Sequence, residues 1–65
     1  MRIECTTIRF KFARAKGTIF VYHNAVMATW GNACFHIDGI TGELREYIES
    51  NYRSQIDAAQ DAMRA

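Results

Sequence analysis

The stretch AVMATWGNACFHI, residues 25–37, decides how this chain folds. Two apolar segments flank the dipeptide Gly31-Asn32, and the second segment alternates from one side to the other. Two such segments joined by two residues of this kind indicate a β-hairpin. Glycine at the first loop position is what a type II′ turn requires, because that position has a positive φ. The sequence therefore predicts an antiparallel hairpin with its turn at Gly31-Asn32.

The segment at the start of the chain predicts another strand. From Thr6 to Ala13 the residues alternate with a period of two, which is typical of a strand with one buried face. One side carries three large apolar residues, namely Ile8, Phe10 and Phe12. Arg9 and Lys11 lie on the other side. We therefore expect the apolar side to face the core and the two cations to face outward.

Residues 14–23 are expected to continue the sheet. Residues 14–17 are predicted to form a short turn in which Gly17 supplies a positive φ. Residues 18–23 have apolar side chains on both sides, as expected of a central strand that is covered on one face. Asn24 is then predicted to bend the chain before residues 25–37. Because this bend either separates two strands or interrupts one, the sheet is expected to have three or four strands.

The last third of the chain predicts one long helix. Asp38-Gly39 ends the sheet, and Thr41 is a suitable N-cap. At about 100° per residue, one apolar stripe runs along the helix, formed by Leu44, Ile48, Tyr52, Ile56, Ala59 and Met63. Such a stripe packs on a sheet. The expected fold is a single α+β domain, residues 1–65, with an antiparallel meander over about 3–38 and a helix over about 41–64, in the order βββα or ββββα.

The composition is that of one small globular domain. A chain of 65 residues has room for one core, and its hydrophobic fraction of 49% and charged fraction of 23% are ordinary for a folded protein. No apolar run approaches the length of a membrane helix, and no signal peptide is visible. Cys5 and Cys34 are too few for a disulfide-stapled secreted domain and are expected to be free thiols. We therefore expect a soluble protein of the cytoplasm.

The stretch KGTIFVYH, residues 16–23, shares some residues with the signature strand of an RNA-recognition motif. The aromatic ring that stacks on the first base is missing, and 65 residues with one helix are too few for that fold, which excludes it. A more general nucleic-acid-binding function remains. Cations beside aromatic rings on an open sheet face bind single strands, because they neutralise phosphates and stack bases. The candidate residues are Arg9, Lys11, Lys16, Phe20 and Tyr22.

The sequence does not predict a catalytic or metal centre. Cys5, His23, Cys34 and His36 are competent zinc ligands, but only the last two are closely spaced, and two ligands do not hold zinc. No evident orienting group accompanies a Cys–His pair, and no glycine-rich phosphate loop leads from a strand into a helix. We therefore expect a protein without enzymatic activity and without a cofactor.

Charge is distributed unevenly along the chain. Residues 1–33 contain five basic residues and one acidic residue, whereas residues 34–65 contain three basic and six acidic residues. The acidic residues of the second half are Asp38, Glu43, Glu46, Glu49, Asp57 and Asp61. Carboxylates spaced along a rigid helix can imitate a phosphate backbone and occupy a site built for nucleic acid. These six residues are therefore the candidate partner-binding residues.

In its size, its small α+β domain and these six acidic residues, the chain resembles the small phage-encoded inhibitors of CRISPR–Cas complexes, the anti-CRISPR proteins. The resemblance implies a non-enzymatic protein in the host cytosol whose partner is a host protein or ribonucleoprotein complex, such as a subunit of a Cas effector. We expect the acidic face of the helix to make this contact, and the resemblance implies that such inhibitors sometimes act by mimicking DNA. The alternative is a small nucleic-acid-binding domain that uses its basic and aromatic sheet face.

Overall fold

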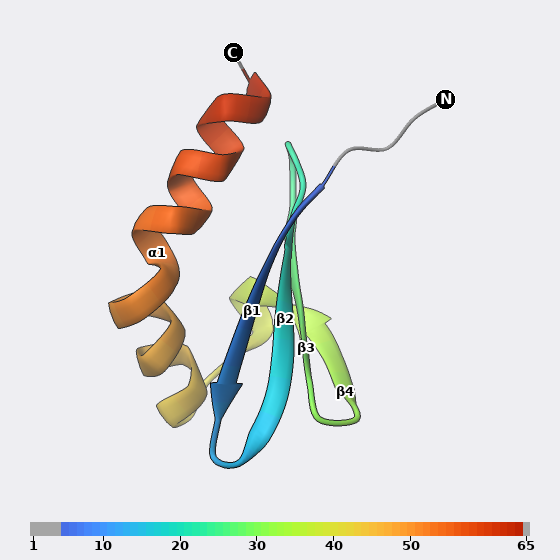
Figure 1. The fold of residues 1–65 in the computed structure, drawn as a ribbon, viewed down its shortest axis with the longest axis vertical. Helices are drawn as coiled ribbons and strands as arrows, with labels where there is room; N and C mark the ends of the chain where they lie inside the picture. The colour runs from blue at the N-terminus through green and yellow to red at the C-terminus, as the bar shows by residue number, and fades with distance from the viewer. Residues whose placement is uncertain (1–4, 65) are drawn as a thin grey trace.

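A four-stranded antiparallel sheet with one long helix makes up the protein (Figure 1). The computed structural model describes residues 5–64, so residues 3 and 4 of the predicted sheet lie outside the described part. The elements are β1 (Thr6–Phe12), β2 (Ala15–Val21), β3 (Val26–Trp30), β4 (Ala33–His36), the short 3-10 helix η1 (Ile37–Gly39) and α1 (Gly42–Arg64). The strands are neighbours in chain order, β1-β2-β3-β4. The α+β meander is confirmed, and of the two orders expected, the chain adopts ββββα.

The hairpin at Gly31-Asn32 forms as predicted. Trp30 and Ala33 are cross-strand partners, so Gly31 and Asn32 alone make the turn between β3 and β4. Gly31 has a φ of 58°, which is the value that the first position of a type II′ turn demands.

The turn between β1 and β2 differs from the prediction at residues 14–17. Phe12 pairs with Ala15, so the turn consists of Ala13 and Arg14, which have φ values of 51° and 66°. Two successive positive φ angles are typical of a type I′ turn, which Asn-Gly usually forms. Gly17 lies inside β2 instead, and its partner is Phe10. The prediction was wrong because the glycine serves a packing contact and not a turn.

Close contacts with the two neighbouring strands explain why residue 17 is glycine. A Cβ added at Gly17 would lie 2.3 Å from Cζ of Phe10 and 2.5 Å from the carbonyl oxygen of Thr29. Both distances are far below van der Waals contact, so the Phe10 ring occupies the space that a side chain at residue 17 would need.

The bend predicted at Asn24 is the turn that separates β2 from β3. The amide of Tyr22 donates a hydrogen bond of 2.8 Å to the carbonyl oxygen of Ala25, and Val21 pairs with Val26. Strand β2 therefore ends at Val21, two residues before the predicted end at His23. This places Tyr22 in the turn and not in the strand.

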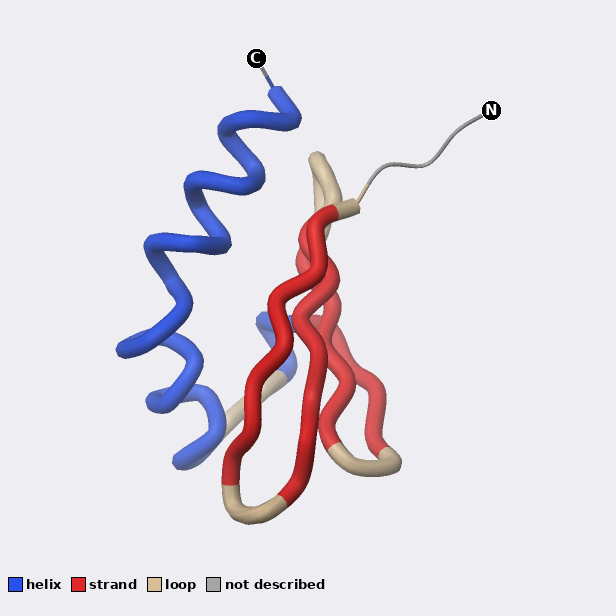
Figure 2. Tube along the Cα trace, viewed as in Figure 1, coloured by secondary structure: helices blue, strands red, loops and turns tan. Residues whose placement is uncertain are grey.

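The hydrophobic core lies between the sheet and α1, which covers one face of the sheet (Figures 1 and 2). Alternate residues of all four strands face it, and Phe10, Ile19 and Ala28 are buried. From the predicted helix stripe, Ile48 and Ile56 have exposed fractions of 1% and 0%. The other core residues are Val21, Val26, Ile40 and Leu44, with Tyr52 and Ala59 packed against them. All members of the predicted stripe except Met63 therefore lie in the core or pack against it.

Two hydrogen bonds tie the last turns of α1 to the turn between β2 and β3. Nε2 of Gln60 donates to the carbonyl oxygen of Tyr22 at 3.1 Å, and Nε of Arg64 donates to that of His23 at 3.2 Å. Together with the core contacts they fix the direction of the helix across the sheet. The helices within residues 5–64 lack the apolar length that a membrane crossing requires.

Candidate functional site

The face of the sheet that points away from α1 is its open face. Within residues 5–64, no helix or strand lies over it (Figure 1). Because side chains alternate across a strand, the residues between the core positions point to this face. They are Thr7, Arg9, Lys11, Lys16, Thr18, Phe20, Met27, Thr29, Cys34 and His36. This is the surface on which the sequence placed the candidate nucleic-acid-binding residues.

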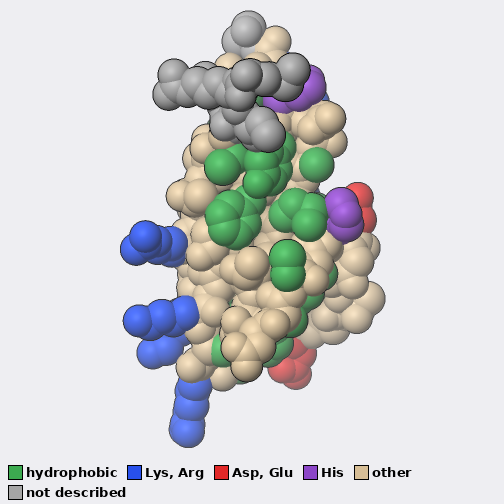
Figure 3. Space-filling model, turned by 90° about the vertical axis from the view of Figure 1, so that its right-hand side faces the viewer, with side chains coloured by type: hydrophobic (Ala, Val, Ile, Leu, Met, Phe, Trp, Pro, Cys, Tyr) green, Lys and Arg blue, Asp and Glu red, His purple; other side chains and the backbone are tan. Residues whose placement is uncertain are grey.

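Cations gather at one corner of the open face, along β1 and the first residues of β2. Lys11 and Lys16 are direct cross-strand partners, and Arg9 lies two pairs further along the same two strands, opposite Thr18. Figure 3 shows Lys and Arg side chains along one edge of the face, with acidic side chains only at its other margins. We call Arg9, Lys11 and Lys16 the basic corner.

The Lys11–Lys16 pair is of the kind in which two cross-strand side chains come close together. The carbonyl oxygen of Lys16 accepts a hydrogen bond from the amide of Gly31 at 3.0 Å, so the backbone of Lys16 bonds toward β3 and not toward β1. Lys11 and Lys16 are therefore a non-hydrogen-bonded pair, the kind in which the two side chains come closest. Like charges directly opposite each other destabilise a sheet. The described strands contain no Asp or Glu that would offset this cost.

Of the two predicted aromatic residues, Phe20 joins the basic corner and Tyr22 does not. Phe20 pairs with Thr7 on β1 and with Met27 on β3, which puts it diagonal to Arg9. Tyr22 lies in the turn beyond β2, about 20 Å along the strand from Lys16 at 3.3 Å per residue. The structure therefore brings together Arg9, Lys11, Lys16 and Phe20.

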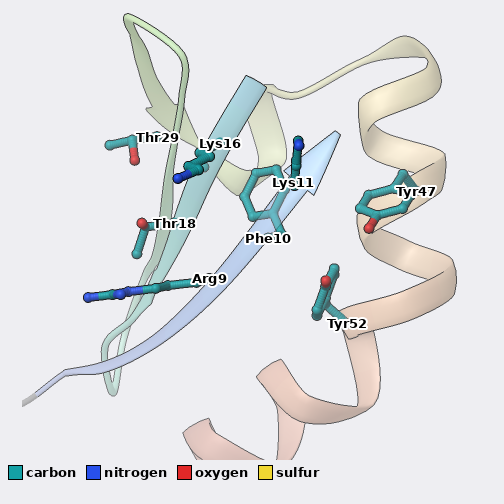
Figure 4. A pocket seen from close by; sticks show the side chains of 9 residues that line it. Arg9, Phe10, Lys11, Lys16, Thr18, Thr29, Tyr47 and Tyr52 are labelled. Atoms are coloured by element: carbon teal, nitrogen blue, oxygen red, sulfur yellow. The ribbon is translucent and has the colours of Figure 1, made fainter. Parts of the chain in front are cut away.

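A hollow beside β1 adds residues that the sequence did not single out. Its lining includes the basic corner together with Thr18 and Thr29 on the open face. Phe10, Tyr47 and Tyr52 line it from the other side of the sheet (Figure 4). Because these groups lie on opposite sides of the sheet, the hollow is no closed cavity but a depression around the free edge of β1.

The aromatic part of this hollow is a cluster of four rings between β1 and α1. The ring centroids of Phe10 and Tyr52 are 6.2 Å apart, those of Phe12 and Tyr47 5.0 Å, and those of Tyr47 and Tyr52 5.9 Å. The side chain of Tyr47, followed by partial burial, raises the pKa of Tyr52, so the phenol of Tyr52 stays neutral at physiological pH. In the sequence, Tyr52 was identified only as a core residue.

The six predicted acidic residues do not form one uniform surface. Asp38 lies on η1, outside the helix. Arg53 binds Glu49 through two hydrogen bonds, Nε to Oε2 at 2.9 Å and Nη2 to Oε1 at 2.6 Å, and it also contacts Asp57 at 3.5 Å. The hydrogen bond from Arg53 lowers the pKa of Glu49. The charges of Glu49 and Asp57 are therefore partly neutralised within the helix.

The remaining acidic residues of the helix, Glu43, Glu46 and Asp61, are exposed. They point away from the sheet, because they lie on the side of α1 opposite Ile48. No ion pair to these three residues is present in the described part of the chain.

The thiols and imidazoles do not form a site. Cys34 and His36 are both exposed on β4, and Cys5 is exposed just before β1. Among residues 5–64, no group of three His, Cys, Asp or Glu side chains is placed to hold a metal ion.

Comparisons with protein-family models, with curated proteins and with solved structures find no match to this chain.

Proposed function

We propose that this protein binds single-stranded nucleic acid on the open face of its sheet. The observation that carries the proposal is the Lys11–Lys16 pair, whose like charges lie directly opposite each other on an uncovered face. The repulsion between the two lysines destabilises the free protein. An anionic ligand that binds between them would remove this repulsion, which would contribute to the binding free energy.

The residues around this pair support a single strand as the anion. The basic corner would neutralise phosphates, while the ring of Phe20, next to Arg9 and Met27, offers a flat apolar surface for a base. Thr18 and Thr29 are cross-strand partners between the cations and β4, and their hydroxyls can donate to phosphate or base oxygens. Binding of this kind needs no catalytic group and no cofactor, and its ligands are found in the cytoplasm.

Fluorescence anisotropy with labelled single- and double-stranded oligonucleotides tests the proposal. Wild type should bind the single strand more tightly, with an affinity that falls as salt rises. Phe20→Ala should weaken single-strand binding by about tenfold, since base–aromatic stacking contributes about 1–3 kcal/mol. Arg9→Glu with Lys11→Glu should abolish it.

The matched control reverses two charges on the opposite surface. Glu46→Lys with Asp57→Lys changes the net charge by the same amount in the other direction but leaves the open face intact. If the sheet variants bind the oligonucleotide like wild type, the open face is not the nucleic-acid site.

A second candidate function follows from Glu43, Glu46 and Asp61, which are exposed on one side of a 23-residue helix and have no ion-pair partner among residues 5–64. This function is inhibition of a nucleic-acid-handling host complex, of the anti-CRISPR kind, in which these carboxylates enter a basic groove. Asp57 lies on the same side of the helix and is only partly neutralised by Arg53. The charge reversal of Glu46 and Asp57 should therefore lower affinity for the partner, such as a Cas effector, by tenfold or more. The reversal of Arg9 and Lys11 should then be nearly silent. The same two double variants therefore decide between the two functions.

A further inference from the structure

Strand β1 is a free edge of the sheet. It pairs only with β2, and Figure 1 looks onto this edge, with β1 in front of the other strands and no described segment in front of it. The other edge strand, β4, has four residues and leads directly into η1, whereas β1 has seven. A long uncovered edge strand is a template for the addition of another strand.

The hydrogen-bonding groups at this edge are identified by the pairing of Lys16. Since the backbone of Lys16 bonds toward β3, its partner Lys11 has its own amide and carbonyl on the side away from β2. By the alternation of an antiparallel strand, Arg9 and Thr7 do the same. Three residues therefore present unpaired backbone donors and acceptors along the edge.

The two sides of this edge differ in chemistry. The side chains of Arg9 and Lys11 stand on the open face, and both are exposed cations. On the helix side, the edge borders the rings of Phe10, Tyr47 and Tyr52 (Figure 4). A strand added next to β1 would place one set of alternate side chains beside the cations and the other set beside the rings.

We propose that the β1 edge is a docking site for an extended peptide segment of a partner protein, with acidic and apolar residues in alternation. The acidic residues lie opposite Arg9 and Lys11, and the apolar residues lie against Phe10, Tyr47 and Tyr52. The backbone of the segment bonds to Thr7, Arg9 and Lys11, as in other cases of strand addition.

Charge argues against a second copy of this chain as the occupant. Antiparallel pairing of two β1 strands would bring Arg9 and Lys11 of both copies together on one face, and like charges across strands are destabilising. Edge cations of this kind prevent self-pairing in other sheets. An acidic strand gains from the same charges.

The test uses the wild-type protein and a synthetic peptide of alternating valine and glutamate, end-capped and fluorescently labelled. Fluorescence anisotropy should show saturable binding, while a peptide of alternating valine and lysine should bind at least tenfold more weakly. In NMR spectra, the amide signals of Thr7, Arg9 and Lys11 should shift most, and those of β4 should not shift.

Two further peptides are N-methylated at alternate residues, one set on each edge of the peptide strand. One of them should lose binding at least tenfold and the other should retain it, because only one edge pairs with β1.

Two protein variants separate this site from the proposed nucleic-acid site. Thr7→Pro removes an outward backbone amide of the β1 edge, and proline is tolerated at such edge positions. This variant should bind the peptide at least tenfold more weakly, while its affinity for the oligonucleotide is unchanged. Phe20→Ala should do the reverse. Equal binding of the two N-methylated peptides, amide shifts confined to β4 or α1, or dimerisation of the free protein through β1 in sedimentation experiments would each overturn the proposal.

Discussion

The indole nitrogen of Trp30 in β3 donates a hydrogen bond of 3.0 Å to the carbonyl oxygen of Phe12 in β1, across the strand that lies between them. Their ring centroids are 5.8 Å apart. The contact is possible because the residues of β2 that pair with them, Gly17 and Ala15, have no side chain or only a methyl group. Small residues in β2 thus allow side chains of β1 and β3 to pack on each other over β2.

Gly17→Ala should destabilise the protein, because its methyl group would collide with the Phe10 ring and with the Thr29 carbonyl. Overpacking of this kind costs about 1–3 kcal/mol, which thermal unfolding followed by circular dichroism would detect. The control is Gly39→Ala, where an added Cβ has no neighbour within 4 Å. If both variants unfold at the same temperature, the close approach at Gly17 is not real.

The turn of Ala13 and Arg14 should be open to stabilisation. Both residues adopt positive φ angles, which cost an ordinary residue about 1–2 kcal/mol. Ala13→Asn with Arg14→Gly supplies the residues that a type I′ turn prefers, and should raise the free energy of unfolding by about 1 kcal/mol. In a domain of this size that corresponds to about 4–8 °C in Tm.

The opposite change in the second hairpin serves as the control for this prediction. Gly31→Ala puts a side chain at a φ of 58°, and should lower the stability by a similar amount. A loss of stability in the Asn-Gly variant would show that the β1–β2 turn has another conformation.

Lys11→Glu should move stability and nucleic-acid binding in opposite directions. It replaces a repulsion by an attraction opposite Lys16, and should add about 0.5 kcal/mol to the free energy of unfolding. It should also weaken oligonucleotide binding and reduce the slope of log affinity against log salt by at least about one, because a phosphate contact is lost. Lys11→Gln separates the removal of the repulsion from the new attraction. Weaker binding with lower stability would point to damage to the fold.

The bond between Glu49 and Arg53 should make stability depend on pH in the acid range. Because Arg53 lowers the pKa of Glu49 below its ordinary value of 4.5, the pair stabilises the protein at neutral pH. This contribution is present above 4.5 and is lost as the pH falls through the lowered pKa. Glu49→Gln should therefore unfold at a lower temperature than wild type at neutral pH, and the difference should vanish at pH values well below 4.5. A difference in Tm that is the same at both pH values would exclude this origin.

Much of this fold was predictable because it depends on local patterns. The helix stripe around Ile48 and the glycine of the Gly31-Asn32 turn are both visible in a few consecutive residues. The turn at Ala13 and Arg14 was not, because neither residue favours a positive φ and the tertiary structure imposes it. Gly17 was misinterpreted for a similar reason: the Phe10 ring that requires it comes from another strand.

The candidate site was predictable to the same degree. Alternation alone places Arg9 and Lys11 on the outward face of a strand, whereas the cross-strand register decides that Lys16 lies opposite Lys11. The hollow at the β1 edge depends on where α1 crosses the sheet, so no sequence pattern pointed to Tyr47. Tyr22 was assigned to the site because the strand was expected to run two residues further than it does.

The order of the strands, in which each pairs only with the next, has a consequence for the speed of folding. Most contacts of such a meander join residues close in sequence, so little loop entropy is lost before each hairpin forms. Hairpins form in about 1–10 μs, and the slowest step left is the docking of α1 on β1 and β2, which completes the core. The chain also contains no proline, whose isomerisation is the commonest cause of slow phases. We therefore expect refolding after a rapid dilution from denaturant to follow one fast exponential with no slow component.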